Sequence, residues 1–253
     1  MKTIQKDSID LINLKHIYSS ESAETYRDDE YVYKIFDDPE HPFTKDHAKK
    51  ARLMHQYRFV LDKHIILPRE MIVCEGLDAG YTTRYINNNQ VLANYEVHNI
   101  EQLKMLYSYL YDLCHLLKVL HSHGIVVGDY HFHNVLVKNN QVYMIDFDNV
   151  RLRNMCAYTP SFMLQAFAKM YEIPLGYENI NEDSDRLSLL LSTLQLFLGD
   201  KTLFLSGNFV EEMKERYILV NNIIAELARI IKRREIIDIP LPSDLVTLKK
   251  KPF

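Results

Sequence analysis

The stretches GDYHFHNVLV, Gly128–Val137, and YMIDFDN, Tyr143–Asn149, decide how this chain is expected to fold. Asn134 follows Asp129 by five residues, and Asp146 follows Asn134 by twelve. Each stretch joins a turn to a β-branched, apolar run, which predicts a hairpin-like layout that brings its two ends together. Three oxygen-bearing side chains would then meet at one point. Hard cations such as Mg2+ prefer this ligand set, commonly shared with substrate phosphates.

This pattern resembles the catalytic loop and the metal-binding aspartate of the protein-kinase-like superfamily. The resemblance implies that Asp129 is the base that accepts a substrate hydroxyl proton, and that Asn134 and Asp146 hold the Mg2+ that bridges the phosphates of ATP. It also requires a cation on the third strand, and YVYKIF, Tyr31–Phe36, supplies Lys34 95 residues before Asp129. The alternative is two solvated turns, because Asp, Asn and His are ordinary turn formers.

The resemblance implies two further contacts with the nucleotide. The first turn of this family is normally rich in glycine, which lets backbone N–H groups approach phosphate. Here the turn YSSESAETY contains no glycine, and the hydroxyls of Ser20 and Ser22 would donate to phosphate instead. In GYTTRYI, Thr83 would control access to a pocket behind the adenine. Adenine would be hydrogen-bonded by the backbone of Arg84, Tyr85 and Ile86.

The chain departs from the family at the helix that normally supplies a glutamate to the strand lysine. The helix DHAKKARLMHQYRF offers Lys49, Lys50 and Arg52 where an acid is expected. Lys34 would therefore need another partner or depend on Asp146 and phosphate, and the basic run is interpreted as a solvated helix face. Asp185, at the start of SDRLSLLLSTLQLFLG, matches the Asp that braces the catalytic loop in this family, but a plain helix-cap role is equally open.

The order of the predicted elements indicates an α+β, bilobal protein-kinase-like fold within a single domain, residues 1–253. A small β-rich N-lobe with one helix covers about 1–86, and a mainly helical, shortened C-lobe covers about 91–253, with NNNQ at 87–90 as the hinge. Strands are expected at 11–17, ETYR, YVYKIF, ILPREMIVCE and GYTTRYI, and helices at 44–61, 103–123, 187–198 and 210–234. The leucines from 103 to 120 step by three and four residues, as on one face of a helix.

Composition excludes several classes of protein. The chain has 253 residues, 47% of them hydrophobic and 25% charged, which is ordinary for a soluble globular protein. A net charge of −4 argues against nucleic acid as a partner. No run approaches the length of a membrane span, and no apolar segment of signal-peptide length opens the chain. Three widely spaced cysteines indicate a reducing compartment, so a cytoplasmic protein is expected.

The expected function is an ATP- and Mg2+-dependent phosphotransferase that phosphorylates Ser/Thr hydroxyls, similar to compact bacterial Ser/Thr protein kinases. Two alternatives use the same fold: a kinase of small molecules, and a pseudokinase that binds nucleotide or regulates a partner. The missing glycines and the missing helix acid favour the pseudokinase. A fourth hypothesis is a zinc hydrolase, because His121, His123, His131 and His133 flank Asp129 and His/Asp clusters can bind zinc.

Overall fold

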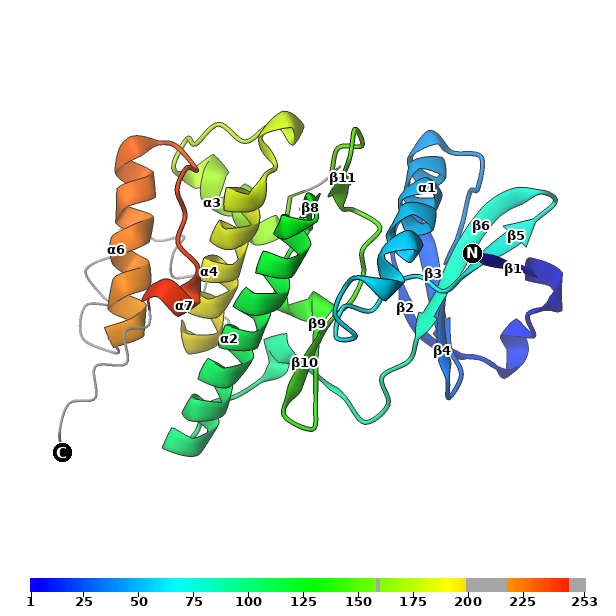
Figure 1. Ribbon diagram of the computed structural model, residues 1–253, viewed down its shortest axis with the longest axis horizontal. Coiled ribbons are helices and arrows are strands. Elements are labelled where there is room, and N and C mark those ends of the chain that lie inside the picture. The colour runs from blue at the N-terminus through cyan, green and yellow to red at the C-terminus, as the bar shows by residue number, and fades with distance from the viewer. Residues whose placement is uncertain (158–159, 199–217, 246–253) are drawn as a thin grey trace. The chain divides into compact units, whose positions relative to one another are not determined.

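The computed structural model describes residues 1–157, 160–198 and 218–245 (Figure 1). The chain divides into two compact units. The first unit contains residues 1–89 and 143–149, and the second contains residues 90–142 and 150–253. The first unit is built on a β-sheet, whereas the second is mainly helical, so the predicted mixed α+β class is confirmed.

The first unit contains a six-stranded sheet in the order β1-β5-β6-β4-β3-β2. Its neighbours pair antiparallel except for β1, which runs parallel to β5. The turn between β5 and β6 consists of Glu75 and Gly76, both with positive φ, as a tight hairpin turn requires. The strands are β1 (Lys2–Gln5), β2 (Lys15–Ser19), β3 (Ala23–Arg27), β4 (Tyr31–Phe36), β5 (Glu70–Cys74) and β6 (Leu77–Arg84).

Helix α1 (Pro42–Gln56) packs on one face of this sheet. The side chain of His41 accepts a hydrogen bond from the amide of Phe43, and Pro42 occupies the first turn, where its missing N–H costs nothing. The apolar contact joins two alanines of α1 to residues of β3, β4, β5 and β6. Its buried members are Ala23, Phe36, Ala48, Ala51, Met71 and Tyr81.

The second unit is organised around α2 (Ile100–Ser122) and α4 (Glu182–Leu198), and α4 packs against α3, α6 and α7. The leucines of the predicted stripe on α2 are buried at 106, 110, 113, 117 and 120. Gly124, with φ of +69°, follows α2 and donates its amide hydrogen to the carbonyl of His121, as is usual at a helix end. Among the described residues of this unit, the other helices are α3 (Phe162–Met170), α6 (Ile218–Arg233) and α7 (Pro242–Leu245).

Short strands and 3-10 turns complete the chain. The predicted hairpin contains β9 (Val135–Lys138) and β10 (Gln141–Met144), joined by Asn139 and Asn140, both with positive φ. These strands form the sheet β10-β9-β7 with β7 (Gln90–Val91), and β8 (Ile125–Val126) pairs with β11 (Arg151–Leu152). The 3-10 turns are η1 (Lys6–Ser8), η2 (Leu11–Asn13), η3 (Tyr57–Phe59), η4 (Leu92–Asn94), η5 (Phe132–Asn134) and η6 (Tyr177–Asn179).

The structure corrects several predicted boundaries. The strand expected at 11–17 is wrong in its first half, because residues 11–13 form η2 and pairing begins at Lys15. The expected helix at 44–61 ends at Gln56 and continues as η3. The helix predicted at 210–234 corresponds to α6, which begins at Ile218 in the described chain. The predicted start of this helix, at 210–217, lies outside the described residues. Strand β1 and helix α3 were not predicted. Within the described ranges, no helix has the length and apolar character needed to cross a bilayer.

Candidate functional site

Strand pairing places Lys34 on the face of the sheet that α1 covers. Lys34 of β4 lies directly opposite Tyr81 of β6, so the two side chains share a face. Tyr81 belongs to the apolar cluster that includes Ala48 and Ala51 of α1. The Lys34 side chain is consequently only 19% exposed. A buried ammonium group needs a charged partner.

Two carboxylates meet the ammonium group of Lys34. Its Nζ lies 2.9 Å from Oδ1 of Asp146 and 2.6 Å from Oδ2 of Asp148. Burial alone would lower the pKa of Lys34, but the two carboxylates hold that pKa well above its usual value. Burial alone would raise the pKa of Asp148, but Lys34 lowers it to about 2. Both groups are therefore charged at neutral pH.

The segment that carries these carboxylates is fixed by backbone hydrogen bonds within the first unit. Met144 donates its amide hydrogen to the carbonyl of His64 at 2.9 Å and accepts one from the amide of Ile66 at 2.8 Å. Two residues later, Asp146 adopts a φ of +65°, a conformation that costs energy in any residue with a side chain. Its Oδ1 also accepts a hydrogen bond from the hydroxyl of Tyr81 at 3.4 Å.

Asp148 has a second neighbour, on helix α1. Nδ1 of His47 lies 3.5 Å from Oδ2 of Asp148. Burial lowers the pKa of His47 and outweighs the opposing effect of Asp148, so the imidazole is neutral at pH 7. Since a carboxylate only accepts hydrogen bonds, an attractive contact requires the proton on Nδ1. Sequence reasoning missed both Asp148 and His47; the only signal was the repeated acid in IDFDN.

The basic run of α1 is not the solvated face that was expected. The side chain of Lys50 is fully buried, with its Nζ 3.2 Å from Oδ2 of Asp46. The guanidinium of Arg52 donates two hydrogen bonds to the carboxylate of Asp78, one of them 2.7 Å long. Lys49 is exposed. Two of the three basic residues thus hold α1 together or attach it to the sheet.

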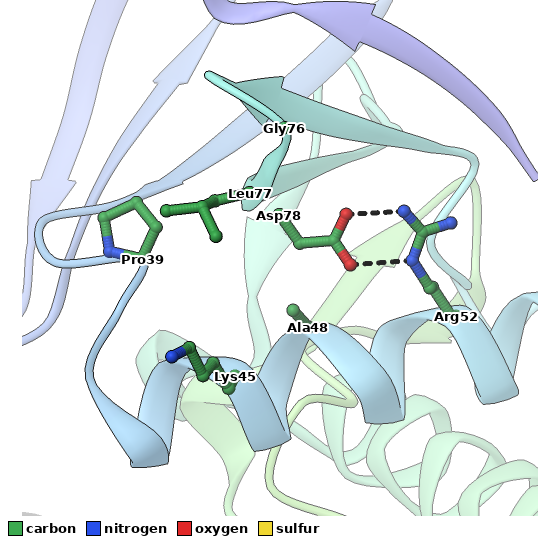
Figure 2. Close-up of a pocket in the computed structure, with 7 residues that line it drawn as sticks. All are labelled: Pro39, Lys45, Ala48, Arg52, Gly76, Leu77 and Asp78. Carbon is green, nitrogen blue, oxygen red and sulfur yellow. Dashed lines mark hydrogen bonds and ion pairs between the residues drawn. The ribbon is translucent and has the colours of Figure 1, made fainter.

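A pocket of about 290 Å³ lies beside the pair of Arg52 and Asp78 (Figure 2). Figure 2 shows the two dashed contacts of this pair at one side and the ring of Pro39 at the other. The lining residues are Pro39, Lys45, Ala48, Arg52, Gly76, Leu77 and Asp78. Neither Lys34 nor a carboxylate next to it lines this pocket, so it is distinct from the candidate site.

The turn between β2 and β3, where phosphate contacts were expected, is closed by one of its own hydroxyls. Oγ of Ser20 donates to the carbonyl of Ala23 at 3.0 Å and accepts from the amide of Ala23 at 3.1 Å. It also accepts from the amide of Ser22 at 3.4 Å. Ser20 would have to break these bonds to donate its hydroxyl to a phosphate.

The segment expected to contact adenine lies at the end of β6. Thr83 shares the face of Lys34 and Tyr81, because side chains alternate along a strand and Tyr81 lies two residues earlier. The amide of Tyr85 donates to the carbonyl of Glu30 at 2.8 Å. The amide group of Asn89 donates to the carbonyl of Ile86, and the guanidinium of Arg84 donates to the carbonyl of Lys63 at 3.2 Å. Two of the expected backbone groups thus already have partners within the first unit.

In the second unit, Asp185 fixes the backbone that precedes Asp129. The Asp185 side chain is fully buried, and its carboxylate accepts the amide hydrogens of Val127 at 2.7 Å and Gly128 at 2.9 Å. Nε2 of His121 lies 3.0 Å from the same carboxylate. Gly128 has a φ of +76° and sits at the centre of a three-residue turn closed by the Asp129 amide and the Val127 carbonyl. The expected contact of Asp185 with the backbone before Asp129 is thus observed.

The loop that follows brings Asp129, His131 and Asn134 together. Nδ2 of Asn134 donates to the backbone carbonyl of Asp129 at 3.3 Å and lies 3.3 Å from Nε2 of His131. Nε2 of His131 lies 3.5 Å from Oδ1 of Asp129. Since Nδ2 of Asn134 faces the loop, Oδ1 is the atom of this side chain that a cation would meet. The Asp129 side chain is 38% exposed and accessible to a hydroxyl.

Each unit by itself offers an oxygen ligand of the kind that Mg2+ prefers. In the first unit, Asp146 offers a carboxylate that is 38% exposed, and in the second unit, Asn134 offers an amide oxygen. Among the described residues, no group of three His, Cys, Asp or Glu side chains could hold a metal ion. The zinc-hydrolase hypothesis thus finds no ligand set in that part of the chain.

Comparison with known proteins assigns no family. No protein-family model matches the chain, and no curated protein matches its sequence.

Proposed function

We propose that the chain is an ATP- and Mg2+-dependent phosphotransferase of the protein-kinase-like fold, acting on Ser/Thr hydroxyls in the cytoplasm. The ion pair between Lys34 and Asp146, 112 residues apart in sequence, is the observation that carries the proposal. A buried lysine in a strand, facing a half-exposed carboxylate after a hairpin, is the arrangement that nucleotide phosphates and their metal ion require.

Each residue has a role that follows from its surroundings. Lys34 would neutralise phosphate oxygens from a fixed position, because its ammonium group is buried and anchored. Asp146 and Asn134 would hold Mg2+, which would neutralise the charge that develops on the transferred phosphoryl group. Asp129 would accept the hydroxyl proton of the acceptor. Its backbone is supported by Asp185, so little reorganisation is needed when the substrate binds.

Two alternatives on the same fold keep specific support. The β2–β3 turn contains no glycine and is closed by Ser20, which favours a pseudokinase. A small-molecule kinase would use the same Lys34, Asp129 and Asp146, with a different acceptor. Phosphate transfer separates the enzyme from the pseudokinase, and the identity of the labelled product separates the two kinds of kinase.

The test is incubation of the purified chain with labelled ATP and Mg2+, with and without a cell extract. Label should appear on the chain itself, on a protein or on a small molecule. Asp129→Asn should lower transfer about 10^2- to 10^4-fold, the usual contribution of a general base. Its matched control, Glu101→Gln, changes an exposed carboxylate on α2 and should keep full activity. Equal transfer by the Asp129→Asn variant and the wild type would remove Asp129 from the mechanism.

A further inference from the structure

The acid that α1 carries, Asp46, pairs with Lys50, whereas Lys34 is paired with Asp146 and Asp148. We propose that Asp148 is a positioning residue that holds the ammonium group of Lys34 where it can meet phosphate, with His47 linking Asp148 to α1. The part of this inference that concerns nucleotide rests on the proposed function. The part that concerns the contact between Asp148 and Lys34 does not.

Asp148 suits this role better than Asp146 because of burial and distance. The Asp148 side chain is 6% exposed, against 38% for Asp146. Its Oδ2 lies 2.6 Å from Nζ of Lys34, against 2.9 Å for Oδ1 of Asp146; the Asp146 contact has the geometry of a hydrogen bond, whereas the Asp148 contact is a buried ion pair. A metal ion shared with phosphate would bind the accessible oxygens of Asp146 and thereby weaken the ion pair between Asp146 and Lys34. The ion pair with Asp148 would still hold the ammonium group in place.

The contact also ties the strand of Lys34 to helix α1. His47 is held against the ring of Phe43, with ring centroids 4.0 Å apart, and its Nδ1 faces the carboxylate of Asp148. The run from Lys34 through Asp148 to His47 therefore joins β4 to α1, and all three residues lie in the first unit. A direct pair of Lys34 with an acid on the helix is not needed for this link.

The first experiment measures the coupling between Lys34 and Asp148 in the full chain, by urea unfolding. Lys34→Met leaves a buried carboxylate at Asp148 without its cation, which is costly. Adding Asp148→Asn removes that charge. The ratio of unfolded to folded protein should therefore be about tenfold lower in the double variant than in Lys34→Met alone. The matched control is Asp146→Asn, which changes a half-exposed carboxylate. Added to Lys34→Met, it should lower the ratio of unfolded to folded protein by less than about threefold.

The result that overturns the proposal is a double variant with Asp148→Asn that is no more stable than Lys34→Met alone. A rescue by Asp146→Asn equal to or larger than the rescue by Asp148→Asn also overturns it, because Asp146 would then be the main anchor of Lys34. This experiment requires no activity, so it decides the contact even if the chain transfers no phosphate.

The second experiment measures the dissociation constant of a fluorescent ATP analogue, once with Mg2+ and once with EDTA. Because Asp148 acts through Lys34, Asp148→Asn should weaken nucleotide binding about tenfold, both with Mg2+ and with EDTA. In a chain that already carries Lys34→Met, adding Asp148→Asn should weaken binding no further. Asp29→Asn, at a fully exposed side chain, is the control and should leave binding unchanged. A loss seen only with Mg2+ would make Asp148 a metal ligand and overturn its positioning role. A wild-type chain that binds no nucleotide would refute the proposed function, whereas the unfolding experiment would still decide the contact.

Discussion

Replacing Asp185 by asparagine should destabilise the chain more than the same isosteric change at a partly exposed carboxylate of the second unit, such as Asp183. In the native structure, the buried carboxylate accepts two backbone amide hydrogens and faces Nε2 of His121. The asparagine side chain would keep one acceptor oxygen and turn an NH2 group toward at least one remaining donor. Each buried donor left without an acceptor costs about 1–3 kcal/mol, so we expect a total loss of about 2–4 kcal/mol.

The assay is urea unfolding at neutral pH, together with hydrogen exchange at the amides of Val127 and Gly128. With a urea slope of roughly 1–3 kcal/mol per molar, a loss of this size lowers the unfolding midpoint by about 1 M or more. Exchange should accelerate at whichever of the two amides faces the new NH2 group, because that amide loses its acceptor. The control is Asp183→Asn, since Asp183 also accepts two backbone amide hydrogens, from Asp238 and Ile239, but is 22% exposed.

Water can replace part of the lost hydrogen bonding at Asp183, so its variant should lose only about 1 kcal/mol. An equal or larger loss for Asp183→Asn, or unchanged exchange at Val127 and Gly128, would refute the reasoning from burial.

Three further outcomes follow from the first unit. Asp146→Ala should weaken binding of ATP in the presence of Mg2+ far more than in EDTA, because the carboxylate acts through the metal; thermal shift measures this, and an equal loss in both would contradict it. Ser20→Ala should lower the melting temperature by a few degrees, whereas Ser22→Ala should change it little, since only the hydroxyl of Ser20 closes the turn. Because the pKa of His47 is lowered on folding, the unfolded chain binds more protons below about pH 6.5, so stability falls as the pH drops through that value. Unfolding at several pH values should show a shallower fall for His47→Gln than for the wild type, and an equal fall for both would contradict this account.

The sequence predicted those features that depend on local spacing. The period of the leucines in α2 places them on one buried face, because a helix repeats every 3.6 residues. The alternation in YVYKIF and the hairpin formed by the runs VLV and VYMI similarly follow from the geometry of strands and hairpins. Lys34, by contrast, was selected because the resemblance to the protein-kinase-like family requires a cation on that strand, and the structure places it beside Asp146.

Features that depend on a distant partner could not be predicted in the same way. The sequence predicts Asp183, Ser184 and Asp185 as capping residues at the start of α4, and the structure confirms this for Ser184, whose hydroxyl accepts the amide hydrogen of Asn181 at 2.9 Å. The helix start is capped by the side chain of Asn181, which accepts from the amides of Asp183 and Ser184. The carboxylates of Asp183 and Asp185 instead reach backbone amides 55 and 58 residues away. No local pattern distinguishes these roles, because the choice is made by tertiary packing.

The partner of Lys34 is the clearest case, and it changes how the departures from the family are weighed. Judged from the sequence, the absent acid on α1 favoured a pseudokinase, since the strand lysine would lack its anchor. The structure supplies a buried carboxylate for Lys34 from Asp148, and a neutral imidazole from His47 on α1 faces that carboxylate. An ammonium group between two carboxylates is anchored without a helix acid, so this departure no longer argues against catalysis. The pseudokinase alternative then depends on the glycine-free β2–β3 turn, where Ser20 holds the backbone closed.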